Sequence, residues 1–188
     1  VKAVEGVLRP AITSLLPRPD SGNGIILDVG VNADCKPEAL VQFAILGTMY
    51  SRHIFKIDKP RVGLLNIGSE PEKGNLVTQA TYPLLEANKK INFIGNIEGY
   101  DIFRDSCDVI VCDGFTGNVV LKEAESFYDL LKQRNIKDSY FDRFDYQNYG
   151  GTPILGVNKP VIIGHGVSSP TAFQNMINLA SEVVESKL

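Results

Sequence analysis

Short apolar runs that end in glycine or polar turns are the feature that most constrains how this chain folds. None of the runs alternates apolar with polar residues. A strand that is apolar along its whole length must be covered on both faces, which is typical of a parallel sheet flanked by helices. We therefore predict an α/β fold, a three-layer sandwich with a mostly parallel sheet. The predicted strands are residues 25–29, 62–67, 92–95, 109–112 and 161–163.

Helix-like stretches alternate with these runs. Pro37 suits a first helical turn, and the apolar residues Leu40, Phe43 and Ala44 follow it at helical spacing. Residues 76–85, 123–134 and 172–188 also read as amphipathic helices. Residues 138–149 are too aromatic for a disordered linker. We therefore expect a single α/β domain over residues 1–188, with a short helical and aromatic excursion at 123–149 that faces the body or a partner in a dimer.

Composition argues against several classes of protein. The chain has 188 residues, of which 44% are hydrophobic, and 22 acidic against 19 basic residues give a net charge of −3. This charge disfavours a nucleic-acid partner. The apolar runs are much shorter than the roughly 20 residues of a membrane-spanning helix, and no secretory signal is visible. We therefore expect a cytoplasmic protein.

The cysteines argue against a structural metal. Cys35, Cys107 and Cys112 are an odd number and show no CxxC spacing. This usage is typical of a reducing compartment without a zinc site. We expect three free thiols and no metal.

Glycine, asparagine and charged residues gather directly after the five predicted strands. Because the carboxyl ends of parallel strands meet at one edge of a sheet, we expect the five loops to converge there. They would bring together backbone amides, the cations Lys73 and His165, and the side-chain amides of Asn66, Asn96 and Asn118. Such a set suits a small oxyanion, for example phosphate.

The common nucleotide and hydrolase motifs are missing from the sequence. No GxGxxG joins a strand to a helix, and neither GxxxxGK[ST] nor GxSxG occurs. A dinucleotide site, a P-loop and the nucleophile elbow of a serine hydrolase therefore have little support.

Three long motifs carry a resemblance to a known family. They are VGLLNIGSE at residues 62–70, NFIGNIEG at residues 92–99 and CDGFTGNVVLK at residues 112–122. In this order they resemble the bacterial phosphate acyltransferases of fatty acid and phospholipid synthesis. Residues 27–30, 35–38, 149–151 and 165–166 match as well. The resemblance covers about residues 8–180 and implies a Rossmann-like sandwich, similar to phosphotransacetylases and isocitrate dehydrogenases.

The resemblance also implies a function. Such an enzyme transfers a long-chain fatty acyl group from acyl carrier protein to inorganic phosphate, and the acyl phosphate feeds phosphatidic acid and phospholipid synthesis. It needs no cofactor, forms a homodimer and works in the cytoplasm at the inner face of the membrane. The long amphipathic arm of the family is short here, so we expect at most peripheral membrane contact.

Family members begin with further strand and helix units ahead of the region matched here. We therefore expect the chain to be a carboxyl-terminal piece that lacks about a third of the family's length.

The candidate catalytic residues each have a second interpretation. Lys73 is the candidate cation for phosphate or an oxyanion, or else a solvated surface lysine. Asn118 is expected to cap a helix that begins near Val119, and to orient phosphate in addition. His165 is a candidate proton donor or acceptor, or a buried histidine bonded to a loop. Asp113 is a candidate catalytic carboxylate, or holds a lysine or a turn.

The remaining candidates extend the site. The phosphate-binding set is an anion nest at Gly114, Thr116 and Gly117, together with Asn66 and Gly68. Carrier protein is acidic, so a basic surface is expected to meet it, unless these cations are only solvated. The candidates for substrate or carrier contact are Asn96, Glu98, Arg52, Lys56 and Arg61.

Two other functions remain open. One is a short-chain phosphotransacetylase that uses coenzyme A. The other is a module without catalysis that only dimerises and binds carrier protein. Cys112 is interpreted as a small buried strand residue rather than as an acyl-accepting nucleophile.

Overall fold

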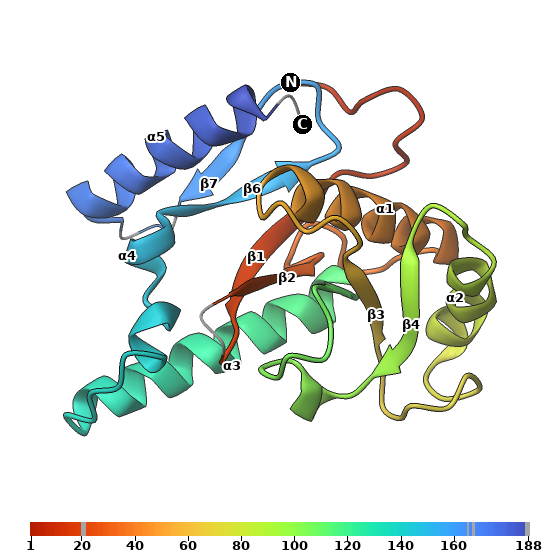
Figure 1. Cartoon of the computed structure of the whole chain (residues 1–188), viewed down its shortest axis with the longest axis horizontal. Coiled ribbons are helices and arrows are strands. Elements are labelled where there is room, and N and C mark those ends of the chain that lie inside the picture. Colours follow the sequence, from red (N-terminus) through yellow and green to blue (C-terminus); the bar gives the residue numbers. More distant parts are fainter. Residues whose placement is uncertain (20–21, 165, 167, 187–188) are drawn as a thin grey trace.

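The computed structural model describes residues 1–19, 22–164, 166 and 168–186, and its strands form one seven-stranded sheet (Figure 1). The strands are β1 (Ala11–Pro17), β2 (Asn23–Leu27), β3 (Arg61–Leu65), β4 (Asn92–Ile97), β5 (Val109–Val111), β6 (Gly151–Leu155) and β7 (Ile162–Gly164). The helices are α1 (Pro37–His53), α2 (Leu76–Glu86), α3 (Gly114–Gln133), α4 (Tyr146–Tyr149), α5 (Pro170–Glu185) and the 3₁₀ turns η1 (Gly99–Asp101) and η2 (Phe141–Phe144).

The sheet has a parallel half and an antiparallel half, in the strand order β4-β3-β5-β2-β1-β6-β7. Strands β4, β3, β5 and β2 pair in parallel, with Ile26 opposite Ile110 and Leu64 opposite Val111. Strand β1 is antiparallel to β2, β6 to β1, and β7 to β6. The α/β class is confirmed, and the structure adds the antiparallel half.

Both faces of the parallel half are buried, as its uniformly apolar strands predict. Ile25 and Leu27 face a core shared with α1 and α2, whereas Ile26 and Ile110 face a second core under the start of α3. Neighbouring residues of one strand thus enter opposite cores. Each such side chain contributes about 1.5–3 kcal/mol by leaving water, so an alternating strand could not replace β2.

Helix α1 packs directly against the sheet, and a glycine on its contact face allows the close approach. Pro37 stands in its first turn, and Arg52 and His53 stand in its last turn, where cations favour the helix dipole. Gly47 is the point of closest approach, since a Cβ there would overlap the side chains of Val109 and Leu27. A larger residue at position 47 would push α1 off the sheet.

Two strands and one helix boundary differ from the sequence-based expectation. Strands β1 and β6 were not predicted, because Thr13 and Ser14 interrupt the first and Pro153 the second. They form because their neighbours β2 and β7 pair with them. The helix expected from residue 123 begins at Gly114 and lies under β2 with Val120 and Leu121.

The expected convergence of five loops is wrong for the last one. Strand β7 is antiparallel to β6, which itself runs in the direction of β2. Gly164 therefore pairs with Gly151 at the amino end of β6, and the carboxyl end of β7 lies at the opposite edge from the other four loops. Periodicity within a strand carries no information on its direction, so the sequence could not reveal this.

The excursion at 123–149 packs on the body of the molecule. It comprises the second half of α3, η2 and α4, and its aromatic rings Tyr140 and Phe144 meet edge to face, as do Phe144 and Phe103. The Tyr140 hydroxyl donates to the carbonyl of Pro17 at 3.2 Å, and Arg143 donates to the carbonyl of Arg18 at 2.6 Å. These bonds tie the excursion to the end of β1.

The sequence predicts that no helix spans a membrane, and the lengths and hydropathies of the described helices test this. Within residues 1–19, 22–164, 166 and 168–186, none of the helices is both long and apolar enough to cross a bilayer.

Candidate active site

Four loops meet at the carboxyl edge of the parallel strands. They follow β2, β3, β4 and β5, and the strand order places the loop after β5 between those after β3 and β2. Hydrogen bonds join them in two pairs. The loop after β2 is bonded to the start of α3, and the loop after β3 is bonded to β4 and its end.

Asp28 is the centre of the first pair. Its carboxylate is fully buried and accepts hydrogen bonds from the amide of Ile12 at 3.0 Å, the amide of Asn32 at 2.6 Å and the side chain of Asn32 at 2.8 Å. A buried carboxylate is tolerated when several donors satisfy it. Asp28 therefore fixes the loop after β2 and joins it to β1.

The beginning of α3 is held by Asp113. Its carboxylate accepts from the amide of Thr116 and from the Thr116 hydroxyl, both at 2.8 Å, which makes Asp113 the N-cap. The expectation that Asn118 caps a helix near Val119 is therefore wrong. Asn118 lies within α3, and its Nδ2 donates to the carbonyl of Val29 at 3.2 Å. Gly30, with φ +142°, leaves room for this amide.

The expected anion nest at the same helix end is already bonded within the chain. The amide of Gly114 donates to Asn32 at 2.7 Å, that of Thr116 to Asp113, and that of Gly117 to the Asp113 carbonyl at 3.0 Å. The Asp113 carboxylate also stands where an anion would bind. These three residues build the helix end, and they do not present free amides to phosphate.

The second pair of loops holds residues 66–75 in place. Asn66 donates through Nδ2 to the carbonyl of Lys73 at 3.0 Å and accepts from the amide of Ile67 at 2.9 Å. Asn96 is 8% exposed and donates through Nδ2 to the carbonyl of Glu70 at 2.7 Å. Both amides, predicted as ligand contacts, act within the protein as braces of this loop.

Lys73 rises from the braced loop into solvent. Its side chain crosses Gly68, where an added Cβ would come within 2.9 Å of the Lys73 Cγ. Among the residues that the structure describes, the Lys73 ammonium forms no ion pair within 4.0 Å. The backbone of Lys73 is thus fixed, and its charge remains available to a ligand.

The basic residues expected to meet carrier protein lie away from this edge. Arg61 begins β3 at its amino end and binds Asp105 at 2.6 Å and Asp108 at 3.2 Å. Hydrogen bonding to Asp108 raises the pKa of the Arg61 guanidinium. Arg52 donates to the carbonyl of Asp58 and Lys56 to that of His53, both at 2.7 Å. The structure therefore does not bring these cations to the candidate site.

Glu98 and His165 complete the set of expected residues. Glu98 follows β4 and precedes η1, where its backbone amide donates to the Asp101 carboxylate at 3.1 Å. His165 lies outside the residues that the structure describes.

The three cysteines are free, as the sequence predicts, and all of them are buried, as was expected for Cys112. Burial raises the pKa of the Cys35 thiol to about 11 and that of Cys107 to about 12, and it raises the pKa of Cys112 well above its usual value. A thiol that stays protonated near neutral pH is a poor nucleophile. Cys112 also donates through its thiol to the carbonyl of Asp28 at 3.5 Å.

Asp28 and Asn32 were missed as organisers of the site. The only signal available was an acid directly after a buried strand, with an asparagine four residues later. The same pattern is ordinary in surface turns. Only the pairing of β1 with β2 reveals that Asp28 is buried and bonded to a distant strand.

Solved structures with related folds share this architecture. A phosphotransacetylase from Streptococcus pyogenes superposes with a TM-score of 0.63 at 18% identity, over 98% of this chain and 57% of that one. A branched-chain phosphotransacylase from Enterococcus faecalis V583 gives a TM-score of 0.62 at 14% identity, over 93% of this chain and 64% of that one. At such low identity, these likenesses establish the fold alone.

Sequence relatives are much closer. A phosphate acyltransferase from Halothermothrix orenii is 45% identical over 202 aligned residues, covering 97% of this chain and 60% of the relative. One from Acidobacterium capsulatum is 45% identical over 199 residues, covering 96% and 58%. The chain thus spans about 60% of the length of the curated relatives that it matches. A family model described as fatty acid synthesis protein matches residues 1–188, and the chain belongs to this family.

Proposed function

We propose that the protein carrying this chain transfers a long-chain fatty acyl group from acyl carrier protein to inorganic phosphate. The observation that carries the proposal is the Lys73 ammonium, which stands on a braced loop at the carboxyl edge of the sheet and has no ion-pair partner among the described residues. A fixed cation with an available charge suits a phosphate dianion. Membership of the family supports a reaction in which phosphate accepts an acyl group, rather than another reaction of phosphate.

The reaction needs no covalent intermediate on the enzyme. A phosphate oxygen attacks the thioester carbonyl, the carbon becomes tetrahedral, and collapse of this species expels the carrier thiolate, which takes up a proton. Lys73 holds phosphate and offsets negative charge as the oxyanion develops. The protonated state of Cys112 agrees with direct attack by phosphate.

Asn118 and Asp113 have separate roles in this proposal. Asn118 is exposed, and one hydrogen of its Nδ2 is bonded to the carbonyl of Val29, which orients the side chain. The second hydrogen has no acceptor among the described residues and is available to phosphate or the carbonyl oxygen. Asp113 acts by capping α3 and so positions Asn118.

The partners follow from the reaction. We propose acyl carrier protein and phosphate as substrates, a homodimer, and a cytoplasmic location at the inner face of the membrane. Support for a partner surface comes from the exposed apolar side chains Phe127 and Leu130 on α3, which the body of the molecule does not cover. Introducing Phe127→Glu should dissociate the dimer, as sedimentation would show, and an unchanged mass would place the dimer contact elsewhere.

The decisive experiment follows the carrier thiol. Long-chain acyl carrier protein is incubated with the intact protein that carries this sequence, with and without phosphate. Phosphate-dependent release of thiol, together with acyl phosphate trapped by hydroxylamine, supports the proposal. Faster turnover of acetyl coenzyme A than of acyl carrier protein would favour the short-chain phosphotransacetylase, and carrier binding without any release would favour the module without catalysis.

A further inference from the structure

The sheet forks between β1 and β6. These strands pair only at Ala11 with Leu155 and at Ile12 with Ile154. Beyond Ile12, β1 stays with β2 as far as Pro17, while β6 turns away with β7. Helix α3 and the segment of η2 and α4 close the open side of the fork (Figure 1). A pocket of about 240 Å³ lies inside it.

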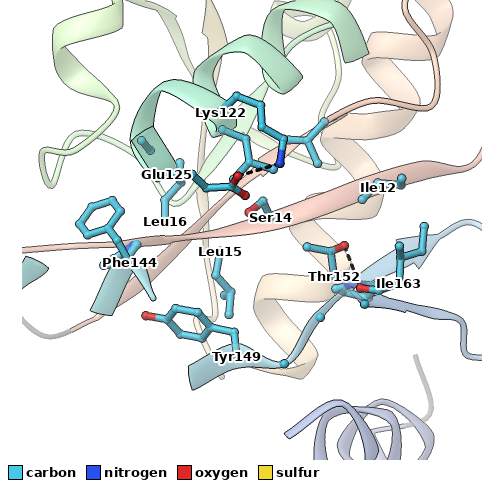
Figure 2. Close-up of a pocket in the computed structure, with 18 of the residues that line it drawn as sticks. Ile12, Ser14, Leu15, Leu16, Lys122, Glu125, Phe144, Tyr149, Thr152 and Ile163 are labelled. Atoms are coloured by element: carbon cyan, nitrogen blue, oxygen red, sulfur yellow. Dashed lines mark hydrogen bonds and ion pairs between the residues drawn. The ribbon is translucent and has the colours of Figure 1, made fainter. Parts of the chain in front are cut away.

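The pocket is apolar along its length and charged at one side. Leu15, Leu16, Leu121 and Phe144 are among the residues that line it. Lys122 and Glu125 form an ion pair of 2.7 Å at its wall. Figure 2 shows this pair on one side of β1, with Leu15 and Tyr149 on the other.

One end of the pocket meets the candidate active site. Val29 lines the pocket, and its carbonyl accepts the hydrogen bond from Asn118. Lys122 stands one helical turn after Asn118 and so shares its face of α3. From this end the pocket follows β1 from Ile12 to Pro17, a length of about 17 Å at strand geometry.

We propose that this pocket holds the hydrocarbon chain of the acyl group, with the thioester end toward Asn118 and Lys122. The inference rests on the proposed acyl transfer, whose site it extends. The apolar lining matches methylene groups, and the strand-long shape matches an elongated ligand. Each methylene buried there should raise affinity about fourfold, which corresponds to about 0.8 kcal/mol.

A fluorescent reporter tests binding without requiring activity. The chain contains no tryptophan, so Phe144→Trp places a single one at the pocket in the intact protein that carries this sequence, if the rest of that protein also has none. Palmitic acid should shift its emission to the blue at lower concentration than octanoic acid does. The matched control is Phe173→Trp, which is exposed on α5 and not part of the lining. Equal shifts in both variants would show nonspecific association and overturn the proposal.

A substitution that fills the pocket tests its link to catalysis. Ala124 lines the pocket from α3, and Ala124→Phe should weaken palmitate binding and long-chain turnover at least tenfold while sparing a butyryl donor. Ser126→Phe, an exposed position on the same helix, is the control and should change neither. Circular dichroism and melting temperature establish that both variants fold.

The outcomes separate the two proposals. Palmitate binding that Ala124→Phe abolishes, in a protein that never releases carrier thiol, would support the pocket and reject the acyl transfer. Thiol release with an unchanged preference for chain length in Ala124→Phe would support the transfer and reject the pocket. A reporter at position 144 that is already blue-shifted and insensitive to palmitate would mean that a protein segment occupies the pocket, which also rejects the inference.

Discussion

Two segments at the same edge of the sheet have similar compositions, but they differ in whether their polar groups are hydrogen-bonded within the protein. Residues 66–75 and residues 113–118 both combine glycine, asparagine and charged residues directly after a buried strand. In the second, the carboxylate of Asp113 and the amides of Gly114 and Thr116 are all bonded within the chain. In the first, side-chain amides brace the backbone and leave the Lys73 ammonium in solvent.

The difference shows how one kind of loop can serve as scaffold or as ligand contact. A polar group that is already hydrogen-bonded within the protein must break those bonds to contact a ligand, and this costs free energy. A lysine with no internal partner among the described residues has no such bond to give up. We therefore expect changes near Asp113 to alter stability, and changes at Lys73 to alter only the handling of phosphate.

The largest effect on stability is expected from Asp28→Asn. The amide would keep one acceptor and would turn a donor toward the amide of Ile12 or the side chain of Asn32, which now donate to Asp28. A loss of about 3 kcal/mol in the free energy of unfolding follows, because hydrogen bonds to a buried charge are lost. Urea denaturation measures it. A loss below about 0.5 kcal/mol would mean that the loop after β2 is not held through this carboxylate.

Substitution of one glycine in each segment tests how tightly the two segments are packed. A Cβ on Gly117 would overlap the carbonyl oxygen of Asp28, whereas a Cβ on Gly68 would meet only the flexible side chains of Lys73 and Glu70. Gly117→Ala should therefore cost about 2 kcal/mol, and Gly68→Ala less than about 1 kcal/mol. Thermal and urea unfolding of the two variants side by side decide this. Equal losses would show that both loops are equally rigid.

Asp113→Ala should cost about 1 kcal/mol because α3 loses its N-cap. Asp113→Asn should keep nearly all of the stability, since asparagine caps almost as well. If capping is the whole role of Asp113, the asparagine variant also keeps its rate of thiol release. A stable asparagine variant that has lost at least tenfold in rate would make Asp113 a catalytic carboxylate instead.

The smallest effect on stability belongs to Lys73→Ala. Because the side chain is exposed and has no ion pair with any described residue, its loss should change the free energy of unfolding by less than about 0.5 kcal/mol. The concentration of phosphate needed for half-maximal thiol release should rise at least about tenfold, or about 1.4 kcal/mol. Lys89→Ala, another exposed lysine in the chain, is the control. Identical phosphate dependence in both variants would leave Lys73 a solvated surface residue.

The sequence alone determined the α/β class, the buried parallel strands and the order of the polar loops. Uniformly apolar runs such as residues 25–27 and 109–112 have only one stable environment, between two layers, so local composition suffices to identify them. The resemblance carried by residues 62–70, 92–99 and 112–122 led to the family that the comparisons establish. The choice of Lys73 came from its place between an acid and a glycine in a loop, and its role in binding phosphate stays a prediction.

The tertiary structure decided what each polar group does. Asn66 and Asn96 look like ligand contacts in sequence, but partners seven and 26 residues away take up their amides. Asp28 owes its burial to β1, a strand whose Thr13 and Ser14 hide it from sequence patterns, and the direction of β7 depends on pairing with β6. Hydrogen bonding between distant segments has no local signature, because any donor can satisfy any acceptor that the fold brings near.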